Sequence, residues 1–157
     1  MARAEAVLNF RVPADPEVSR IVREGTSDFA RSQRVGEDDL NHFLTALGEA
    51  VANAVEHARA QQPIAVHVRL EEDLIVACVE DDGVGFPSDA LMFAPELPPL
   101  DAERGRGLAI MRRCSDIFNV KSAPGTGTSI VLGRYLRERT VSQRSVGNAK
   151  SGTANVA

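Results

Sequence analysis

A long amphipathic helix followed directly by a β-hairpin is the feature that most limits what this chain can fold into. Between residues 37 and 61, apolar side chains recur at helical spacing and fall on one face, at about 100° per residue. They are Leu40, Phe43, Leu44, Leu47, Val51, Ala54, Val55 and Ala58. This helix is predicted to stop before Pro63. Residues 64–70 then alternate as IAVHVRL, and residues 74–79 form the apolar run LIVACV after an acidic turn. The pattern predicts a first strand with one wet face and a second, buried central strand.

Further elements are predicted on either side of this unit. Residues 6–12 are short and mixed polar and apolar, which indicates a first strand. Asp15 and Pro16 predict the start of a helix, with aspartate as N-cap and proline as the first helical residue. Residues 117–121 and 128–135 predict two more strands, joined by a Pro-Gly-Thr-Gly turn.

Two segments stand apart from these elements. Residues 87–104 contain four prolines and are long for a structureless connection, which is typical of a lid or binding loop. Residues 140–157 are polar and small, so we expect a disordered tail there. The predicted organisation is one domain over residues 1–139, followed by this tail.

Composition limits the class of protein. With 157 residues, 43% hydrophobic and 25% charged, the chain has ordinary globular composition and no room for a second domain of usual size. No apolar run approaches the roughly 18 residues of a membrane span, and early polar residues argue against a signal peptide. Cys78 and Cys114 lack metal-site spacing, which favours a reduced cytoplasmic protein. A net charge of −4 argues against non-specific nucleic-acid binding.

Three polar residues on the long helix are candidates for chemistry. Glu49, Asn53 and His57 stand four residues apart, so they stack along one side of the helix, roughly opposite the apolar stripe. Taken alone, this spacing favours a solvated polar face. A ligand-binding row is the alternative.

An acid and two glycines follow the buried strand. Asp81 leaves that strand, and Gly83 and Gly85 come two and four residues later. Glycine permits positive φ and lets the backbone approach a ligand closely, and a carboxylate accepts hydrogen bonds from an exocyclic amine. Asp-Gly is also a common turn pair, so a plain turn fits equally well.

A third signal is the segment Gly105-Arg106-Gly107-Leu108, where the long loop becomes a helix. Free backbone N–H groups at a helix N-terminus, without Cβ atoms in the way, form an anion site. Loop flexibility before a helix start is the alternative. Ile110 stands where the third glycine of GxGxxG would be, and the Walker A pattern is absent.

Taken in order, these segments resemble the GHKL ATPase superfamily, which includes gyrase, histidine kinases and mismatch-repair ATPases. The matching strings are LGEAVANAVEHA (residues 47–58), EDDGVGF (80–86), RGRGLAIM (104–111) and PGTGTSIVL (124–132). The resemblance covers about residues 5–136, and the single-domain size is similar to bacterial anti-sigma-factor serine kinases. It implies a two-layer α/β sandwich of the Bergerat type, with a mixed, mainly antiparallel sheet and helices on one face.

The resemblance implies a site for ATP and Mg²⁺. Asn53 would coordinate a Mg²⁺ that bridges the phosphates, and Glu49, one turn earlier, would be the general base. Mg²⁺ prefers oxygen ligands and keeps several waters, so one amide oxygen plus phosphate oxygens suffice. Phosphoryl transfer depends more on positioning and charge neutralisation than on covalent chemistry.

The resemblance also implies the contacts to the adenine. Asp81 would bind the adenine amine, directly and through water. Gly83 and Gly85 would shape the adenine pocket, and Thr128 would close its adenine side.

The segment from Gly105 to Leu108 would bind the phosphates. Gly105 and Gly107 would offer their backbone. Arg106 would either neutralise phosphate charge or lie solvated in the loop.

Three functions are compatible with this resemblance. The first is an anti-sigma factor that is also a serine/threonine protein kinase, the second is the ATP-binding domain of a histidine kinase, and the third is a nucleotide-binding partner-switch regulator without kinase activity. The missing phosphoacceptor helix pair argues against the second, and Glu49 favours the first over the third. The implied partners are a sigma factor, an anti-anti-sigma protein and a second copy in a homodimer, in the cytoplasm, with neither nucleic acid nor membrane.

Overall fold

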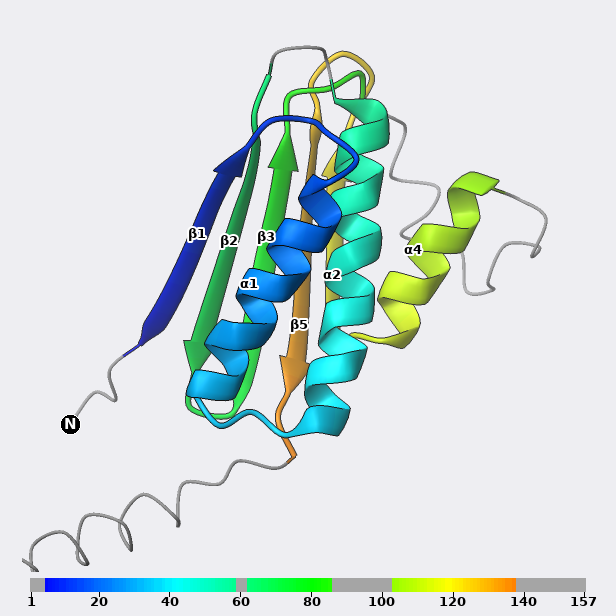
Figure 1. The fold of residues 1–157 in the computed structure, drawn as a ribbon. Coiled ribbons are helices and arrows are strands. Elements are labelled where there is room, and N and C mark those ends of the chain that lie inside the picture. The colour runs from blue at the N-terminus through cyan, green and yellow to red at the C-terminus, as the bar shows by residue number, and fades with distance from the viewer. Residues whose placement is uncertain (1–4, 59–61, 86–102, 138–157) are drawn as a thin grey trace, which may run out of the picture.

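Helices cover one face of a five-stranded sheet in this computed structural model (Figure 1). The structure describes residues 5–58, 62–85 and 103–137. In chain order, its elements are β1 (Ala6–Val12), α1 (Val18–Ser32), α2 (Glu37–His57), β2 (Ile64–Glu71), β3 (Leu74–Asp81), α4 (Glu103–Arg113), β4 (Ile117–Ser122) and β5 (Thr128–Tyr135). The strand order is β1-β2-β3-β5-β4, and all four pairings within the described residues are antiparallel. The predicted two-layer α/β class is confirmed, with a sheet that is antiparallel throughout these residues.

Alternation in β2 separates the core from the open face of the sheet. Ile64, Val66 and Val68 are fully buried beneath the helices, whereas His67 and Arg69, which alternate with the buried residues, are exposed. The next strand, β3, is the middle strand of the sheet and buries every second residue along most of its length. The predicted wet-faced strand and buried central strand are therefore confirmed.

The first helix begins later than predicted. Asp15 and Pro16 lie before α1, which starts at Val18. The Glu17 N–H donates to Asp15 Oδ1 at 2.9 Å, and the Val18 N–H donates to the Asp15 carbonyl oxygen at 3.0 Å. Asp15 therefore closes a turn that leads into the helix and does not cap the helix itself.

The long helix ends earlier than predicted, at His57. Ala58 has extended backbone angles, with φ −65° and ψ 146°. The Val84 N–H donates to the His57 carbonyl oxygen at 3.1 Å. This bond holds the end of α2 against the loop that follows β3.

A buried ion pair joins the start of α2 to the end of the sheet. Arg134 Nε donates to Asp39 Oδ1 at 3.0 Å, and the Arg137 backbone N–H donates to Asp39 Oδ2 at 2.7 Å. Asp39 is 3% exposed and Arg134 is 6% exposed. Asp39 lies in the first turn of α2, and through these two bonds it holds the end of β5 in place.

Some predictions fall outside the described residues. They are the disordered tail over 140–157, the domain end at 139, and the lid over 87–104, apart from its last two residues. Within the described ranges, no helix is long and apolar enough to cross a membrane. The same residues contain no cluster of three metal-binding side chains. Cys78 and Cys114 are free thiols in this structure.

Candidate nucleotide-binding site

The polar row on α2 faces a neighbouring helix. Glu49, Asn53 and His57 are each partly buried, and α4 packs against α2 (Figure 1). The side-chain nitrogen of Asn53 is buried and has no hydrogen-bond partner within the described structure. Of the two alternatives, a fully solvated face does not fit, because all three side chains are partly buried.

Glu49 lies beside the glycine-rich segment of α4. A Cβ atom built on Gly107 would stand 3.2 Å from Glu49 Oε2, closer than side-chain packing usually allows. Glycine at this position leaves room for the carboxylate. The structure thus brings together two motifs that are separated by more than fifty residues in the sequence.

The start of α4 differs from the prediction. The helix opens at Glu103, two residues before Gly105. The first backbone N–H groups of a helix have no partner within it, and Gly105 belongs to that first turn. Gly107 lies beyond it, so its contribution here is the space beside Glu49. Arg106 is exposed, and Leu108 packs against the hydrophobic core.

Asp81 is the last residue of β3. Its Oδ1 atom accepts the Gly83 N–H at 2.9 Å. Partial burial raises the pKa of the Asp81 carboxyl above its usual value, against the opposing effect of the backbone N–H groups of Gly83 and Thr128 and of nearby His57. The carboxylate therefore stands in a partly desolvated place, where a hydrogen-bond donor from a ligand would stabilise it.

Two glycines make the loop after β3 possible. A Cβ atom on Gly83 would collide with the His57 carbonyl oxygen and stand 2.6 Å from Asp81 Oδ1. Gly85 has φ +66°, a backbone conformation that side chains disfavour. Its missing Cβ also leaves room for the Ala123 carbonyl group. The loop is thereby packed between the end of α2 and the β4–β5 turn.

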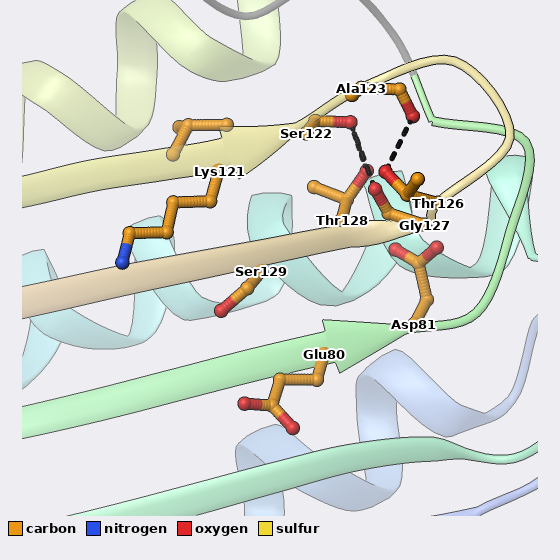
Figure 2. A pocket seen from close by; sticks show the side chains of 10 residues that line it. Glu80, Asp81, Lys121, Ser122, Ala123, Thr126, Gly127, Thr128 and Ser129 are labelled. Carbon is orange, nitrogen blue, oxygen red and sulfur yellow. Dashed lines mark hydrogen bonds between the residues drawn. The ribbon is translucent and has the colours of Figure 1, made fainter.

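A hollow of about 550 Å³ opens at this end of the sheet (Figure 2). Asp81, Ser122, Gly127 and Thr128 are among the residues that line it. The Thr128 hydroxyl lies 2.7 Å from the Ser122 hydroxyl. Asp81 and Thr128 are the predicted site residues that line this hollow. Glu49 instead lies beside Gly107, between α2 and α4. The residues that do not line the hollow are Glu49, Asn53, Gly83, Gly85 and Gly107.

Sequence reasoning missed Ser122. The signal that could have identified it is positional: it ends one strand directly before the turn that leads to Thr128. The strand register then pairs these two residues across β4 and β5.

Comparison with known proteins shows the family of this chain. The sequence model of a family described as "Histidine kinase-like ATPase domain" matches residues 12–133. The anti-sigma F factor of Bacillus licheniformis is 31% identical over 104 residues, which cover 63% of this chain and 71% of that protein. The serine-protein kinase RsbW of Bacillus velezensis is 29% identical over 150 residues, which cover 90% and 92%.

Solved structures share the fold. The RsbU and RsbW domains of a Mycobacterium tuberculosis protein align with a TM-score of 0.62 and 21% identity, over 83% of this chain and 32% of that one. The mycobacterial sensor histidine kinase MprB aligns with a TM-score of 0.53 and 15% identity, over 84% and 99%. From the match over residues 12–133, together with the arrangement around Glu49 and Asp81, this chain belongs to the histidine kinase-like ATPase domain family, within the GHKL superfamily.

Proposed function

We propose that this chain is an anti-sigma factor that binds ATP and Mg²⁺ and phosphorylates a serine or threonine of an anti-anti-sigma protein. The observation that carries the proposal is the position of Glu49, with its carboxylate beside Gly107 of α4 and one helical turn from Asn53. A base and a metal ligand on the same side of one helix can act on the same phosphate group.

The residues present fit a magnesium nucleotide. Mg²⁺ takes oxygen ligands, and the amide of Asn53 offers one. The side-chain nitrogen of Asn53 is buried and has no hydrogen-bond partner among the described residues. A buried polar group without a partner is expected where a side chain meets a ligand. Asp81 would accept the adenine amine, and Gly83, Gly85 and Thr128 would enclose the base.

The phosphates would lie at the start of α4. Gly105 would offer free backbone N–H groups there. Arg106 is exposed and can turn toward a phosphate. Leu108 would hold the helix on the core, and Gly107 would let Glu49 reach the site.

In the proposed transfer step, Glu49 is the proton acceptor. Bound ATP supplies the phosphoryl group, and Mg²⁺ neutralises its charge. Glu49 would accept the proton of a serine or threonine hydroxyl as the hydroxyl oxygen bonds to the γ-phosphorus and the bond from that phosphorus to the ADP oxygen breaks. Asn53 would keep the phosphates aligned for this step.

The names of the relatives support the partners in this proposal. Two are an anti-sigma F factor and a serine-protein kinase. We extend these properties to this chain: a sigma factor and an anti-anti-sigma protein as partners, a homodimer, and a cytoplasmic location. We also propose that residues 1–139 form the ATPase domain and that residues 140–157 form a disordered tail.

The deciding experiment is phosphoryl transfer. The purified full chain is incubated with labelled ATP, Mg²⁺ and a candidate anti-anti-sigma protein, and the labelled residue is then mapped. Label on a serine or threonine of the partner is the expected result. If nucleotide binds but no candidate is labelled, the chain is a nucleotide-binding regulator without kinase activity. No binding at millimolar nucleotide would overturn the assignment entirely.

Replacing Asp81 by asparagine tests the adenine contact. At neutral pH the variant is expected to bind ADP roughly 10-fold or more weakly, because it loses a charge-assisted hydrogen bond. Burial raises the pKa of Asp81 above the ordinary value of about 3.9, so the wild-type carboxylate takes up a proton earlier as pH falls. As pH falls, the affinity of the wild type for ADP should therefore begin to decline at a higher pH than it would with an ordinary aspartate. The affinity of Asp81→Asn should not show this decline.

Calorimetry with ADP between pH 4.5 and 8 measures both effects. The control is Asp82→Asn, because Asp82 is the exposed neighbour of the same charge. Asp81→Asn should still fold. Because the pKa of Asp81 is raised in the folded protein, the ionised carboxylate lowers the free energy of unfolding above that pKa, and asparagine carries no such charge. Unchanged ADP affinity in Asp81→Asn would reduce Asp81 to a turn residue.

A further inference from the structure

Three side chains form a row across the sheet beside the adenine contact. Asp81 of β3 pairs with Thr128 of β5, and Thr128 pairs with Ser122 of β4. Residues directly opposite in antiparallel strands point to the same face. All three border the hollow shown in Figure 2. Any hydrogen bond between the Thr128 hydroxyl and a ligand therefore lies beside the Asp81 carboxylate.

The directions of two hydroxyl hydrogen bonds in this row are linked. Ser122 Oγ donates to the Gly127 carbonyl oxygen at 3.2 Å, and it lies 2.7 Å from Thr128 Oγ1. A serine hydroxyl has one proton. If that proton is given to Gly127, the proton in the Ser122–Thr128 bond comes from Thr128. The Thr128 hydroxyl can then only accept a further hydrogen bond, through its lone pairs.

The backbone around these hydroxyls is held firmly. Gly127 has φ +76°, and a Cβ there would collide with the Asp81 carbonyl oxygen. The turn thus lies directly on the end of β3. Thr128 is only 4% exposed, so its hydroxyl has little solvent with which to exchange partners. The partner that the structure gives the Thr128 hydroxyl is therefore Ser122.

We propose that Ser122 is a positioning residue that keeps the Thr128 hydroxyl a hydrogen-bond acceptor and thereby helps the pocket prefer adenine to 6-oxopurines. This inference rests on the proposed nucleotide site. Adenine carries an amine at position 6, which donates, whereas hypoxanthine carries an oxygen there, which accepts. Two neighbouring acceptors, Asp81 and Thr128, favour the donor and disfavour the oxygen. Without Ser122, Thr128 is free to donate its proton to that oxygen.

The test compares ADP with IDP, which differ in the base at position 6 and the adjacent nitrogen. Calorimetry gives both dissociation constants for the full chain and for Ser122→Ala. The preference for ADP is expected to narrow by roughly 3- to 10-fold in Ser122→Ala, the effect of one neutral hydrogen bond. Ser122→Thr keeps the hydroxyl and should restore the wild-type ratio. If Ser122→Ala fails to fold, Ser122→Cys, similar in shape and a weak donor, has the same expected result.

Thr126→Ala is the matched control. Its hydroxyl donates to the Ala123 carbonyl oxygen at 2.9 Å in the same turn, and so bonds outside the Ser122–Thr128 pair (Figure 2). Its ADP-to-IDP ratio should equal that of the wild type. An unchanged ratio in Ser122→Ala, or an equal loss for both nucleotides, would overturn the role of Ser122 and leave the nucleotide site standing. A wild-type chain that binds neither nucleotide would overturn both.

Discussion

Replacing Glu49 by glutamine is expected to lower phosphoryl transfer by about 10²- to 10⁴-fold, the usual cost of losing a general base. Glutamine keeps the size of the side chain beside Gly107 but cannot take the proton of the attacking hydroxyl. ATP binding should persist, because the proposed adenine and metal contacts are made by other residues. The measurement is the initial rate of labelled phosphate transfer to the partner protein, alongside calorimetry with ATP.

Two further variants separate the role of Glu49 as a base from charge on the helix and from nucleotide binding. Glu56→Gln is the control, because Glu56 is an exposed acid on the same helix, and its transfer rate should match the wild type. Asn53→Ala should lose both transfer and tight nucleotide binding, since the metal helps to hold the phosphates. Equal transfer rates for the wild type and Glu49→Gln would leave the family assignment intact and remove the catalytic role of Glu49.

Replacing Asp39 by alanine is expected to lower the free energy of unfolding by about 3–5 kcal/mol. The change leaves the Arg134 guanidinium buried without its carboxylate and removes the acceptor of the Arg137 N–H. Stabilities of small domains are only about 5–15 kcal/mol, so this loss is a large share of the total and should lower the urea midpoint strongly. Urea unfolding followed by circular dichroism measures the loss.

The control for this variant lies two residues earlier on the same helix. Glu37 pairs with Arg31 at 3.0 Å, but both side chains are more than half exposed. Glu37→Ala should therefore change stability far less than Asp39→Ala, because water screens the pair. Similar losses in the two variants would mean that the Asp39–Arg134 pair contributes no more than a surface contact.

Local patterns predicted the strands well. The bounds of β1 and β5 agree with the prediction to the residue, because alternation and turn residues mark both ends of a strand. The motif order also predicts site roles for Glu49, Asn53 and Asp81, and these roles stay predictions. Alternation, turn residues and motif spacing are short-range features, which a sequence displays directly.

Such local patterns do not predict contacts between residues that are far apart in the sequence. The Asp39–Arg134 pair joins residues 95 positions apart, and nothing near either residue indicates the partner. The burial of the Glu49 row depends on α4, which a helical projection of α2 alone does not include. The early end of α2 likewise depends on a bond from Val84, a residue of a different element.

Both ends of the described chain emerge far from the candidate nucleotide site. Ala6 pairs with Leu70, and Leu74 pairs with Tyr135, at the end of the sheet opposite to the Asp81–Thr128 pair (Figure 1). The α2 helix runs between these two ends and, with 21 residues, spans about 30 Å. A fluorescent label or a surface tether joined next to either end would be anchored at that distance from the bound base. An attachment point at Ala6 or Tyr135 would therefore lie at the end of the sheet opposite to Asp81 and Thr128.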